Sequence, residues 1–518
     1  MDEVDLGGKG KLEPMEIEPE RNKRRPVPYV YLLASMAALN SANLGYDIGI
    51  MGGAATFIKE DWHLSDVQIS LLVGVLNFCA IGGAAVAQVI IDGWGRRATF
   101  EASCCVFITG VLGMALAQNF AMIMCFRVIT GFGVGIGFSV DPVYIAEVAP
   151  KHIRGELVTW SEISINFGIV TGFVAAYLFK DYPTWLSWRL MLGCGAIAPV
   201  VLFLFVFFLM PESPRWLVKM GRHDEARQVL AKVTWPDEDR SAQIKEIEDA
   251  VAREETFKDL GWSVIYKPQT AGIRRSLLVG IGVAGAQQLL AEESLLYYLP
   301  QMLEDIGVDR IDRFRALVFM GILKTLCIVV SANFLDGAGR RPMLLISVGG
   351  MSGCLGGLAA TFYFGRPAMP AIGMIWLYMC FFSLGIGPVT WLLASEVFPL
   401  SIRAKAMACA TTNNRVVSTF IAVTFLRWTD LAGFVSYFAV FATLGLVVWL
   451  LIFLYVPETK GRSLEAMAQH FENVANKANK GKNIQKADEI DTVLERTTES
   501  PIFADPAVVS LQNDINAV

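Results

Sequence analysis

Apolar residues recur along this chain in long runs separated by short polar segments. Twelve such runs are close to the roughly 20 residues that an α-helix needs to cross a bilayer. They lie at 28–54, 66–91, 99–118, 121–144, 157–179, 188–210, 276–303, 314–335, 343–364, 369–393, 406–427 and 432–456. The pattern predicts an all-α membrane protein with twelve transmembrane helices, surrounded by a lipid bilayer.

Composition agrees with this prediction and excludes several other functions. Of the 518 residues 54% are hydrophobic and only 18% are charged, where a soluble domain is nearer a quarter charged. The nine cysteines lie in the apolar runs or at their edges, without metal-ligand spacing, and only four histidines are present. No nucleophile motif appears. We therefore expect no enzyme, no metal or other cofactor, and no nucleic-acid partner.

Basic residues predict the orientation of the chain. The N-terminal tail, 1–27, carries six lysines and arginines, and the long polar segment 211–275 carries twelve. Because basic segments stay on the cytosolic side, both termini are expected in the cytosol. We expect a multi-pass protein of the plasma membrane that works as a monomer.

Three short motifs occur twice, at nearly one offset. "DGWGRR" at 92–97 matches "DGAGRR" at 336–341, "EVAPKHIR" at 147–154 matches "EVFPLSIR" at 396–403, and "PESPRW" from 211 matches "PETKGR" from 457. Parallel repeats of six helices suggest a transporter whose halves rock about a site at mid-membrane. The expected units are 1–27 as a cytosolic tail, 28–210 and 276–456 as six-helix bundles, 211–275 as a helical linker, and 457–518 as a second tail, largely disordered after about 477.

The repeated motifs place acids and bases together at the cytosolic ends of helices. We predict that their ion pairs latch helix ends and release when the halves rock. The latch residues are Asp92, Arg96, Arg97, Glu147, Arg154, Asp336, Arg340, Arg341, Glu396 and Arg403. The alternative is that the positive loops only hold orientation, but the repeated acidic partners favour a latch.

These motifs also carry a family resemblance. "GRR" after the second and eighth runs, "PESPRWL", "PETKGRSLE", "YIAEVAP", "QQ" and "GPVTW" resemble the sugar porter family of the major facilitator superfamily over residues 28 to 466. Within it, "NLGYDIGIMGGAATFIKEDWHLSDVQ", "SEISINFGI" and "GILKTL" are most similar to plant-type polyol and cyclitol proton symporters.

Ionisable residues inside the predicted helices need a cavity or a partner, since each costs about 2.5–3.5 kcal/mol at mid-bilayer on insertion scales. The resemblance puts Asp47 at the position of the proton-binding acid and Arg127 at that of its partner. Burial favours protonation of such an acid and a nearby cation opposes it, so moving the arginine would load or release a proton. The alternative is a static buried ion pair.

The resemblance also implies a substrate site. Its residues are Glu162, Gln287, Gln288, Glu293, Lys324, Trp391 and Asn414. Amides and carboxylates suit hydroxyl groups, and an indole face covers the apolar side of a carbon chain. For each of them, an interhelical hydrogen bond is the alternative.

Two positions depart from the family pattern. Glu293 and Lys324 stand where many hexose members have asparagines, so we predict that they pair across the C-terminal half, with Glu292 facing elsewhere and Glu162 as the next candidate partner for Lys324. Ala291 stands where the family commonly has the glycine at which helix 7 breaks, so we expect a weaker break.

Together these observations predict a proton symporter for a polyol, cyclitol or related monosaccharide, with the proton as coupling ion. Two alternatives remain open. One is a hexose uniporter of the same fold, and the other is a non-transporting sugar receptor.

Overall fold

The computed structural model describes residues 27–150, 153–235, 240–258, 262–268, 270–365, 368–399, 401–460, 467 and 469–474. Regular structure in these residues is helical throughout. The helices are α1 (Pro28–Trp62), α2 (Asp66–Gly93), α3 (Arg96–Ala115), α4 (Phe120–Val148), α5 (Arg154–Phe179), α6 (Thr184–Cys194), α7 (Ile197–Leu209), α8 (Pro214–Lys219), α9 (His223–Val233), α10 (Arg240–Lys258), α11 (Ser263–Tyr266), α12 (Ala271–Leu289), α13 (Glu292–Asp305), α14 (Arg310–Ala338), α15 (Arg340–Tyr363), α16 (Ala368–Leu384), α17 (Ile386–Val397) and α18 (Arg403–Tyr455).

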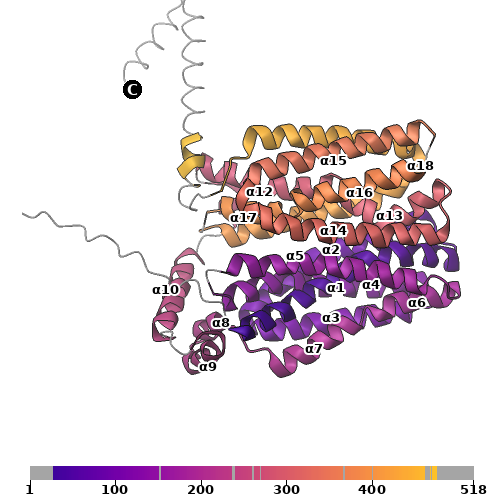
Figure 1. Cartoon of the computed structure of the whole chain (residues 1–518). Coiled ribbons are helices and arrows are strands. Elements are labelled where there is room, and N and C mark those ends of the chain that lie inside the picture. The colour runs from indigo at the N-terminus through magenta and orange to yellow at the C-terminus, as the bar shows by residue number, and fades with distance from the viewer. Residues whose placement is uncertain are drawn as a thin grey trace, which may run out of the picture.

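Two bundles lie side by side, one made of α1–α7 and the other of α12–α18 (Figure 1). Helices α8, α9 and α10 lie at one end of the pair, which we call the linker end; the opposite end is the far end. In the described part of the chain, nine helical stretches are long and apolar enough to span a membrane.

The predicted twelve segments map onto these helices once breaks and joins are considered. The pairs α6–α7, α12–α13 and α16–α17 each correspond to one predicted run, whereas α18 covers two. Gly433 lies inside α18 with φ 76° and ψ 164°, a conformation that is not helical and that separates the last two runs. The twelve-helix fold in two six-helix bundles is therefore confirmed. The prediction for residues after about 477 lies outside the described residues.

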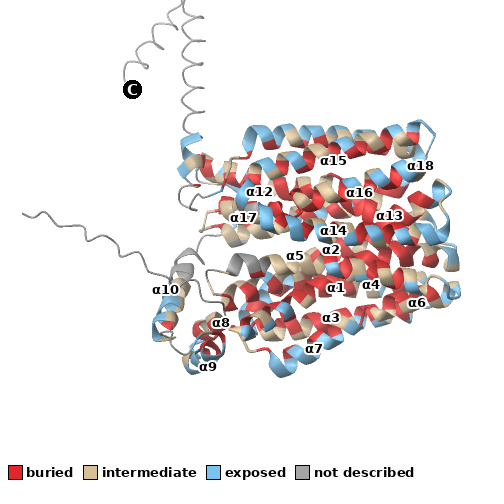
Figure 2. Cartoon of the chain, in the orientation of Figure 1, coloured by how far each residue is buried: buried red, intermediate tan, exposed pale blue. Residues whose placement is uncertain are grey.

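Close packing inside each half depends on small residues where helices cross. A Cβ atom on Gly45 of α1 would lie 1.9 Å from the carbonyl oxygen of Ile165 in α5. Only glycine permits this approach, which is the packing typical of membrane helices. Buried residues concentrate along the helix faces turned to neighbours, and exposed ones on the outer faces (Figure 2).

The two halves touch near the far end. Phe57 of α1 stacks on Phe314 of α14 with ring centroids 6.0 Å apart, and a Cβ on Gly52 would lie 2.9 Å from the Leu296 carbonyl oxygen of α13. Further out, Arg310 reaches Glu60 at 3.3 Å. These contacts join α1 to α13 and to the first turns of α14.

Candidate functional site

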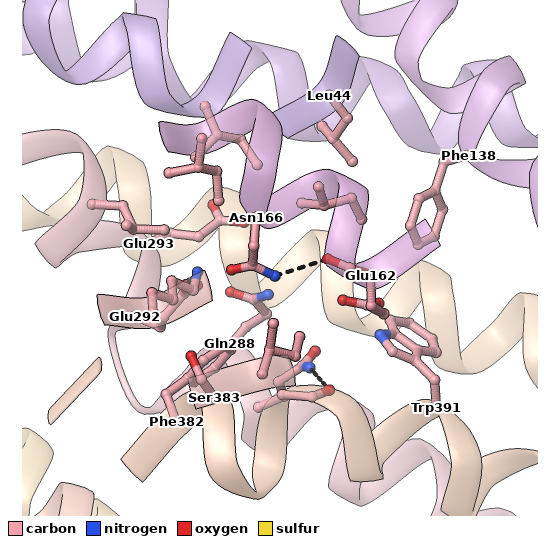
Figure 3. Close-up of a pocket in the computed structure, with 18 of the residues that line it drawn as sticks. Leu44, Phe138, Glu162, Asn166, Gln288, Glu292, Glu293, Phe382, Ser383 and Trp391 are labelled. Atoms are coloured by element: carbon pink, nitrogen blue, oxygen red, sulfur yellow. Dashed lines mark hydrogen bonds and ion pairs between the residues drawn. The ribbon is translucent and has the colours of Figure 1, made fainter. Parts of the chain in front are cut away.

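A cavity with about 80 Å³ of space open to water-sized spheres lies between the two halves. It is lined by Leu44, Ile48, Phe138, Glu162, Ile165, Asn166 and Ile169 of the N-terminal half, and by Gln287, Gln288, Glu292, Glu293, Leu296, Lys324, Ile328, Phe382, Ser383, Gly387, Trp391 and Arg415 of the other. Figure 3 shows polar side chains of both halves turned toward one space. Six of the seven predicted substrate residues line it.

The seventh, Asn414, lies behind the wall. It is fully buried and donates hydrogen bonds to the Ala284 carbonyl and to Gln287 Oε1, the latter at 2.8 Å. Gln287 in turn donates to the Gly387 carbonyl at 2.9 Å. Asn414 therefore fixes the orientation of Gln287, while the buried Oε1 of Gln288 has no hydrogen-bond partner within the described residues. Gln288 is the amide best placed to receive a hydroxyl.

Glu162 and Asn166 enter the cavity from one face of α5. The Asn166 amide donates to the backbone carbonyl of Glu162 at 2.8 Å. Among the described residues, the Glu162 carboxylate has no hydrogen bond or ion pair, although Lys324 lies near enough to influence it electrostatically. Beside it, Phe138 and Trp391 meet edge to face with centroids 6.1 Å apart. This corner offers an acceptor next to two aromatic rings.

The predicted pair of Glu293 with Lys324 is wrong. Lys324 Nζ lies 2.6 Å from Glu292 Oε1, and both side chains are almost completely buried, with 6% and 5% exposed. The Lys324 ammonium also lies 5.1 Å from the centroid of the Phe382 ring. Glu292 of α13 therefore neutralises Lys324 of α14. The prediction that Glu292 faces a different neighbour is wrong too.

Glu293 instead joins the two halves. Its Oε2 accepts hydrogen bonds from Asn77 of α2 at 2.7 Å and from the Ser418 hydroxyl of α18. Arg415 of α18 lies 3.7 Å from its other oxygen and also donates to Asn77 Oδ1 at 3.2 Å. A polar network therefore crosses from one half to the other beside the cavity.

Arg415 and Asn77 were not among the predicted site residues. Arg415 is a charged residue inside the predicted helix 406–427 and follows Asn414 directly, so the reasoning that flagged Lys324 applies to it equally. Asn77 carries no comparable signal, because a single amide in an apolar helix is common and its partner lies 216 residues away.

Asp47 and Arg127 form a buried ion pair within the N-terminal half. Arg127 Nη1 donates to Asp47 Oδ1 at 2.6 Å. The Arg127 side chain is 0% exposed and the Asp47 side chain is 3% exposed. The second Asp47 oxygen and Arg127 Nη2 have no partner among the described residues. Asp47 lies on α1 between Leu44 and Ile48, which both line the cavity. The pair is thus adjacent to the site without being part of its wall.

The helix break beside the site is complete, contrary to expectation. Ala291 has φ 68° and ψ 25°, a left-handed conformation that costs roughly 1–2 kcal/mol for a residue with a Cβ. The Leu290 carbonyl freed by the break accepts the Tyr378 hydroxyl at 2.7 Å. This partner satisfies the exposed backbone, as the membrane interior requires, so α12 and α13 separate at Ala291 without a glycine.

The predicted latch residues form one cluster at the linker end of each half. Arg96 binds Glu147 at 2.6 Å, and Arg340 binds Glu396 at 3.0 Å. Asp92 does not join its neighbouring arginines but pairs with Lys219 of α8 at 2.8 Å.

Further bonds repeat in both halves. Arg97 and Arg341 donate to the carbonyls of Phe207 and Phe453, and Arg403 donates to that of Phe398. The side chains of Arg154 and Asp336 lie outside the described residues. Arg96–Glu147 and Arg340–Glu396 each join helix ends within one half, whereas Asp92–Lys219 joins a helix end to the linker.

An additional acid stands in each cluster. Glu212 accepts the backbone N–H groups of Arg96 and Arg97, and Glu458 accepts those of Arg340 and Arg341. Burial raises the pKa of Glu212 despite these bonds. Burial also opposes ionisation of Glu458, but four backbone N–H groups outweigh it and hold its pKa below the ordinary value.

Comparison with known proteins agrees with this geometry. The family model described as "Sugar (and other) transporter" matches residues 33–471. "Probable polyol transporter 4" of Arabidopsis thaliana is 37% identical over 461 residues, covering 88% of this chain and 87% of that protein. "Polyol transporter 5" of the same plant is 34% identical over 475 residues, covering 88% of this chain and 87% of that protein.

Solved structures show the same fold. The xylose transporter XylE from E. coli in an inward-open conformation has a TM-score of 0.73 at 24% identity, covering 85% of this chain and 99% of that one. The proton:xylose symporter XylE bound to 6-bromo-6-deoxy-D-glucose also gives 0.73, covering 86% and 99%. The family matched is one of transporters, not enzymes. This chain belongs to the sugar transporter family and has the major facilitator superfamily fold.

Proposed function

We propose that this protein is a proton-coupled symporter of a polyol, cyclitol or related monosaccharide that works by alternating access. The observation that carries the proposal is the cavity between two halves, with hydrogen-bonding side chains from both and a buried acid–base pair next to it. A site shared by two halves changes shape whenever they move relative to each other.

The substrate class follows from the side chains of the cavity. Gln288 and Glu162 present acceptors without partners in the described residues, and Trp391 adds an apolar face. A chain or ring of hydroxylated carbons offers donors and acceptors along its edge and C–H groups on its face. The names of the Arabidopsis relatives, polyol transporters, support the same class.

Proton coupling is proposed for Asp47. Its second oxygen has no partner among the described residues, and its bond to Arg127 is a single contact rather than a two-point one. A carboxylate held this way gains a proton when the arginine withdraws and loses it when the arginine returns. The structural relative XylE is a proton:xylose symporter, which is consistent with this role.

Both termini and the linker end would face the cytosol of a plasma membrane, and one copy would be sufficient for transport. No cofactor other than the proton is needed. Residues 28–210 and 276–456 would move as the two transporting units, joined by 211–275 and flanked by the tails 1–27 and 457–518.

Uptake into liposomes by the purified protein tests the proposal. Labelled hexoses, pentoses, polyols and cyclitols would be offered with and without an inward proton gradient. We expect accumulation of a polyol or cyclitol above equilibrium only with the gradient, together with inward current. Equilibration without accumulation would establish a uniporter instead, and binding without any uptake would establish a receptor.

A further inference from the structure

A second, smaller cavity, with about 10 Å³ of space open to water-sized spheres, lies inside the N-terminal half. Its walls come from α1, α3 and α4, and are formed by Asn40, Ser41, Asn43, Leu44, Ser103, Phe107, Gly133, Val134, Gly137 and Phe138. We call it the side chamber. Leu44 and Phe138 also line the main cavity, so the two spaces meet at these side chains. A Cβ on Gly137 would lie 2.5 Å from the Asn40 amide nitrogen and would fill part of the chamber.

Asn43 is the first sign that the chamber takes a ligand. Its side chain is 4% exposed, and neither Nδ2 nor Oδ1 has a partner among the described residues. Buried amides nearly always make hydrogen bonds. A polar chamber with room for about one water molecule supplies them through that water, which can both donate to and accept from this side chain.

Asp141 of α4, held behind the chamber wall by the lining residues Asn40 and Ser41, is the second sign. It is 1% exposed, and its two oxygens accept from Asn40 at 2.8 Å and from Ser41 at 2.5 Å. Within the described part of the chain no lysine, arginine or histidine pairs with it. A carboxylate so deep in a membrane bundle is costly when charged and unpaired, so the site favours a bound cation, of which the smallest is the proton.

The surroundings of Asp141 contain few titratable groups. Cys104 of α3 interacts with it electrostatically. On α1 the next acid is Asp47, and from α5 Glu162 lies beyond Phe138 in the main cavity. On its own helix Tyr144 and Glu147 follow toward the linker end. Asp141 is therefore the acid between Asp47 and the cluster at the linker end.

Helix geometry aligns these groups. Asn40, Asn43 and Asp47 are spaced by three and four residues and therefore lie along one face of α1. With a rise of 1.5 Å per residue, Asn40 lies about 10 Å nearer the linker end than Asp47. The order from the far end to the linker end is Asp47, Asn43, and then Asn40 with its bonded Asp141.

We propose that the side chamber is a proton relay, with Asp141 as its acceptor and Asn43 as the residue that holds the connecting water. This inference rests on the proposed proton coupling by Asp47. The O–H bond of protonated Asp47 breaks as Arg127 returns, and the proton passes through water to a carboxylate oxygen of Asp141. Asp47 becomes charged and pairs with Arg127, while Asp141 becomes neutral. Asp141 then releases the proton to the linker end and regains its charge.

Proteoliposomes containing the full-length protein and a pH-sensitive dye test the relay. Substrate-driven proton movement and substrate exchange at equal concentrations would be measured for each variant, because exchange needs no net proton transfer. For Asp141→Asn we expect proton movement about tenfold slower or more, with exchange little changed. Asn43→Leu, which fills the chamber and leaves Asp141 intact, is expected to do the same, and Asp141→Glu to restore part of the rate.

Ser139→Ala is the matched control, because this hydroxyl on α4 bonds only to the Gly135 carbonyl of its own helix and both rates should stay unchanged. Wild-type proton movement in Asp141→Asn would overturn the relay while leaving Asp47 coupling intact. If Asp141→Asn and Asp141→Glu both lost proton movement and substrate exchange to the same extent, Asp141 would have a structural role and no role in a relay. Dependence of transport on sodium, lost in Asp141→Asn, would replace the proton by a metal cation. If the wild-type protein moves no protons, the proposed proton coupling by Asp47 is itself wrong.

Discussion

Each half of the molecule buries one short ion pair near the central cavity, and the two pairs are built differently. Asp47–Arg127 and Glu292–Lys324 both have an N–O distance of 2.6 Å and nearly no exposure. Glu292 and Lys324 belong to the cavity wall, whereas Asp47 and Arg127 lie behind it. The N-terminal pair leaves one oxygen and one nitrogen without partners among the described residues.

This difference separates two tasks. A pair behind the wall, with an oxygen left over, can change its protonation without touching substrate. A pair in the wall sets the charge and shape that substrate meets, and its neutrality avoids an uncompensated charge in the membrane. We infer that the N-terminal half carries coupling and that the C-terminal pair shapes the site.

Substitutions in the two ion pairs should have the largest effect and should separate coupling from substrate binding. Asp47→Asn should abolish accumulation above equilibrium and preserve exchange, because the variant cannot alternate between charged and neutral forms. The double variant Glu292→Gln with Lys324→Gln keeps the wall neutral and should still accumulate substrate, with altered affinity. Uptake and exchange in proteoliposomes distinguish the two. Accumulation by Asp47→Asn, or its loss only in the double variant, would reverse the assignment.

Stability should identify the partner of Lys324. Lys324→Met strands a buried carboxylate and should cost about 3–5 kcal/mol, whereas adding Glu292→Gln should recover much of this loss. Double-mutant cycles on apparent melting would compare Glu292 with Glu293 as partners of Lys324. We expect the larger coupling for Glu292. A larger coupling for Glu293 would contradict the observed pairing.

Weakening the hydrogen bonds that join Glu293 to Asn77 of the other half should have an intermediate effect on stability. Asn77→Ala removes a donor to buried Glu293 and should cost about 1–3 kcal/mol, loosening the contact between α2 and α13. Hydrogen exchange over residues 295–303 should then become faster. Ser294→Ala is the matched control, since Ser294 bonds to Tyr437 within its own half. Equal acceleration in both variants would mean that α13 loosens as a helix rather than through the contact between halves.

Much of the fold could be predicted from local sequence. The apolar runs and repeated motifs give twelve helices in two halves because helix length and repeat offset are properties of the chain itself. The repeats also place the residues of Arg96–Glu147 and Arg340–Glu396 at the same end of each half, but only the structure shows that these residues pair with each other. Asp47 and Arg127 came together as the resemblance implied, at 2.6 Å.

The direction of side chains after a break could not be predicted in this way. Ala291 turns the chain through a left-handed conformation, so the regular rotation of about 100° per residue no longer relates α13 to α12. This explains why Glu292, rather than Glu293, reaches Lys324. Glu293 is fixed by residues of two other helices, Asn77 and Ser418, and no local pattern predicts a partner more than a hundred residues away.

The smallest expected effect compares the two linker-end acids, Glu212 and Glu458. The raised pKa of Glu212 means that its contribution to stability is greatest at low pH and falls as pH rises from the ordinary glutamate value through the raised one. The lowered pKa of Glu458 has the opposite sign: its contribution is present above the ordinary value and is lost as pH falls through the lowered one. Melting of the purified protein between acid and neutral pH should show this.

Glutamine variants serve as the probes, because each keeps the shape and removes the titration. Glu458→Gln should lower the melting temperature at neutral pH, with the gap to wild type narrowing in acid. Glu212→Gln should lower the melting temperature least at neutral pH, where the wild-type carboxylate is charged in a buried position. The difference in melting temperature from the wild type should widen in acid. Parallel pH profiles for the two variants would mean that the repeated clusters are electrostatically equivalent, despite their different burial.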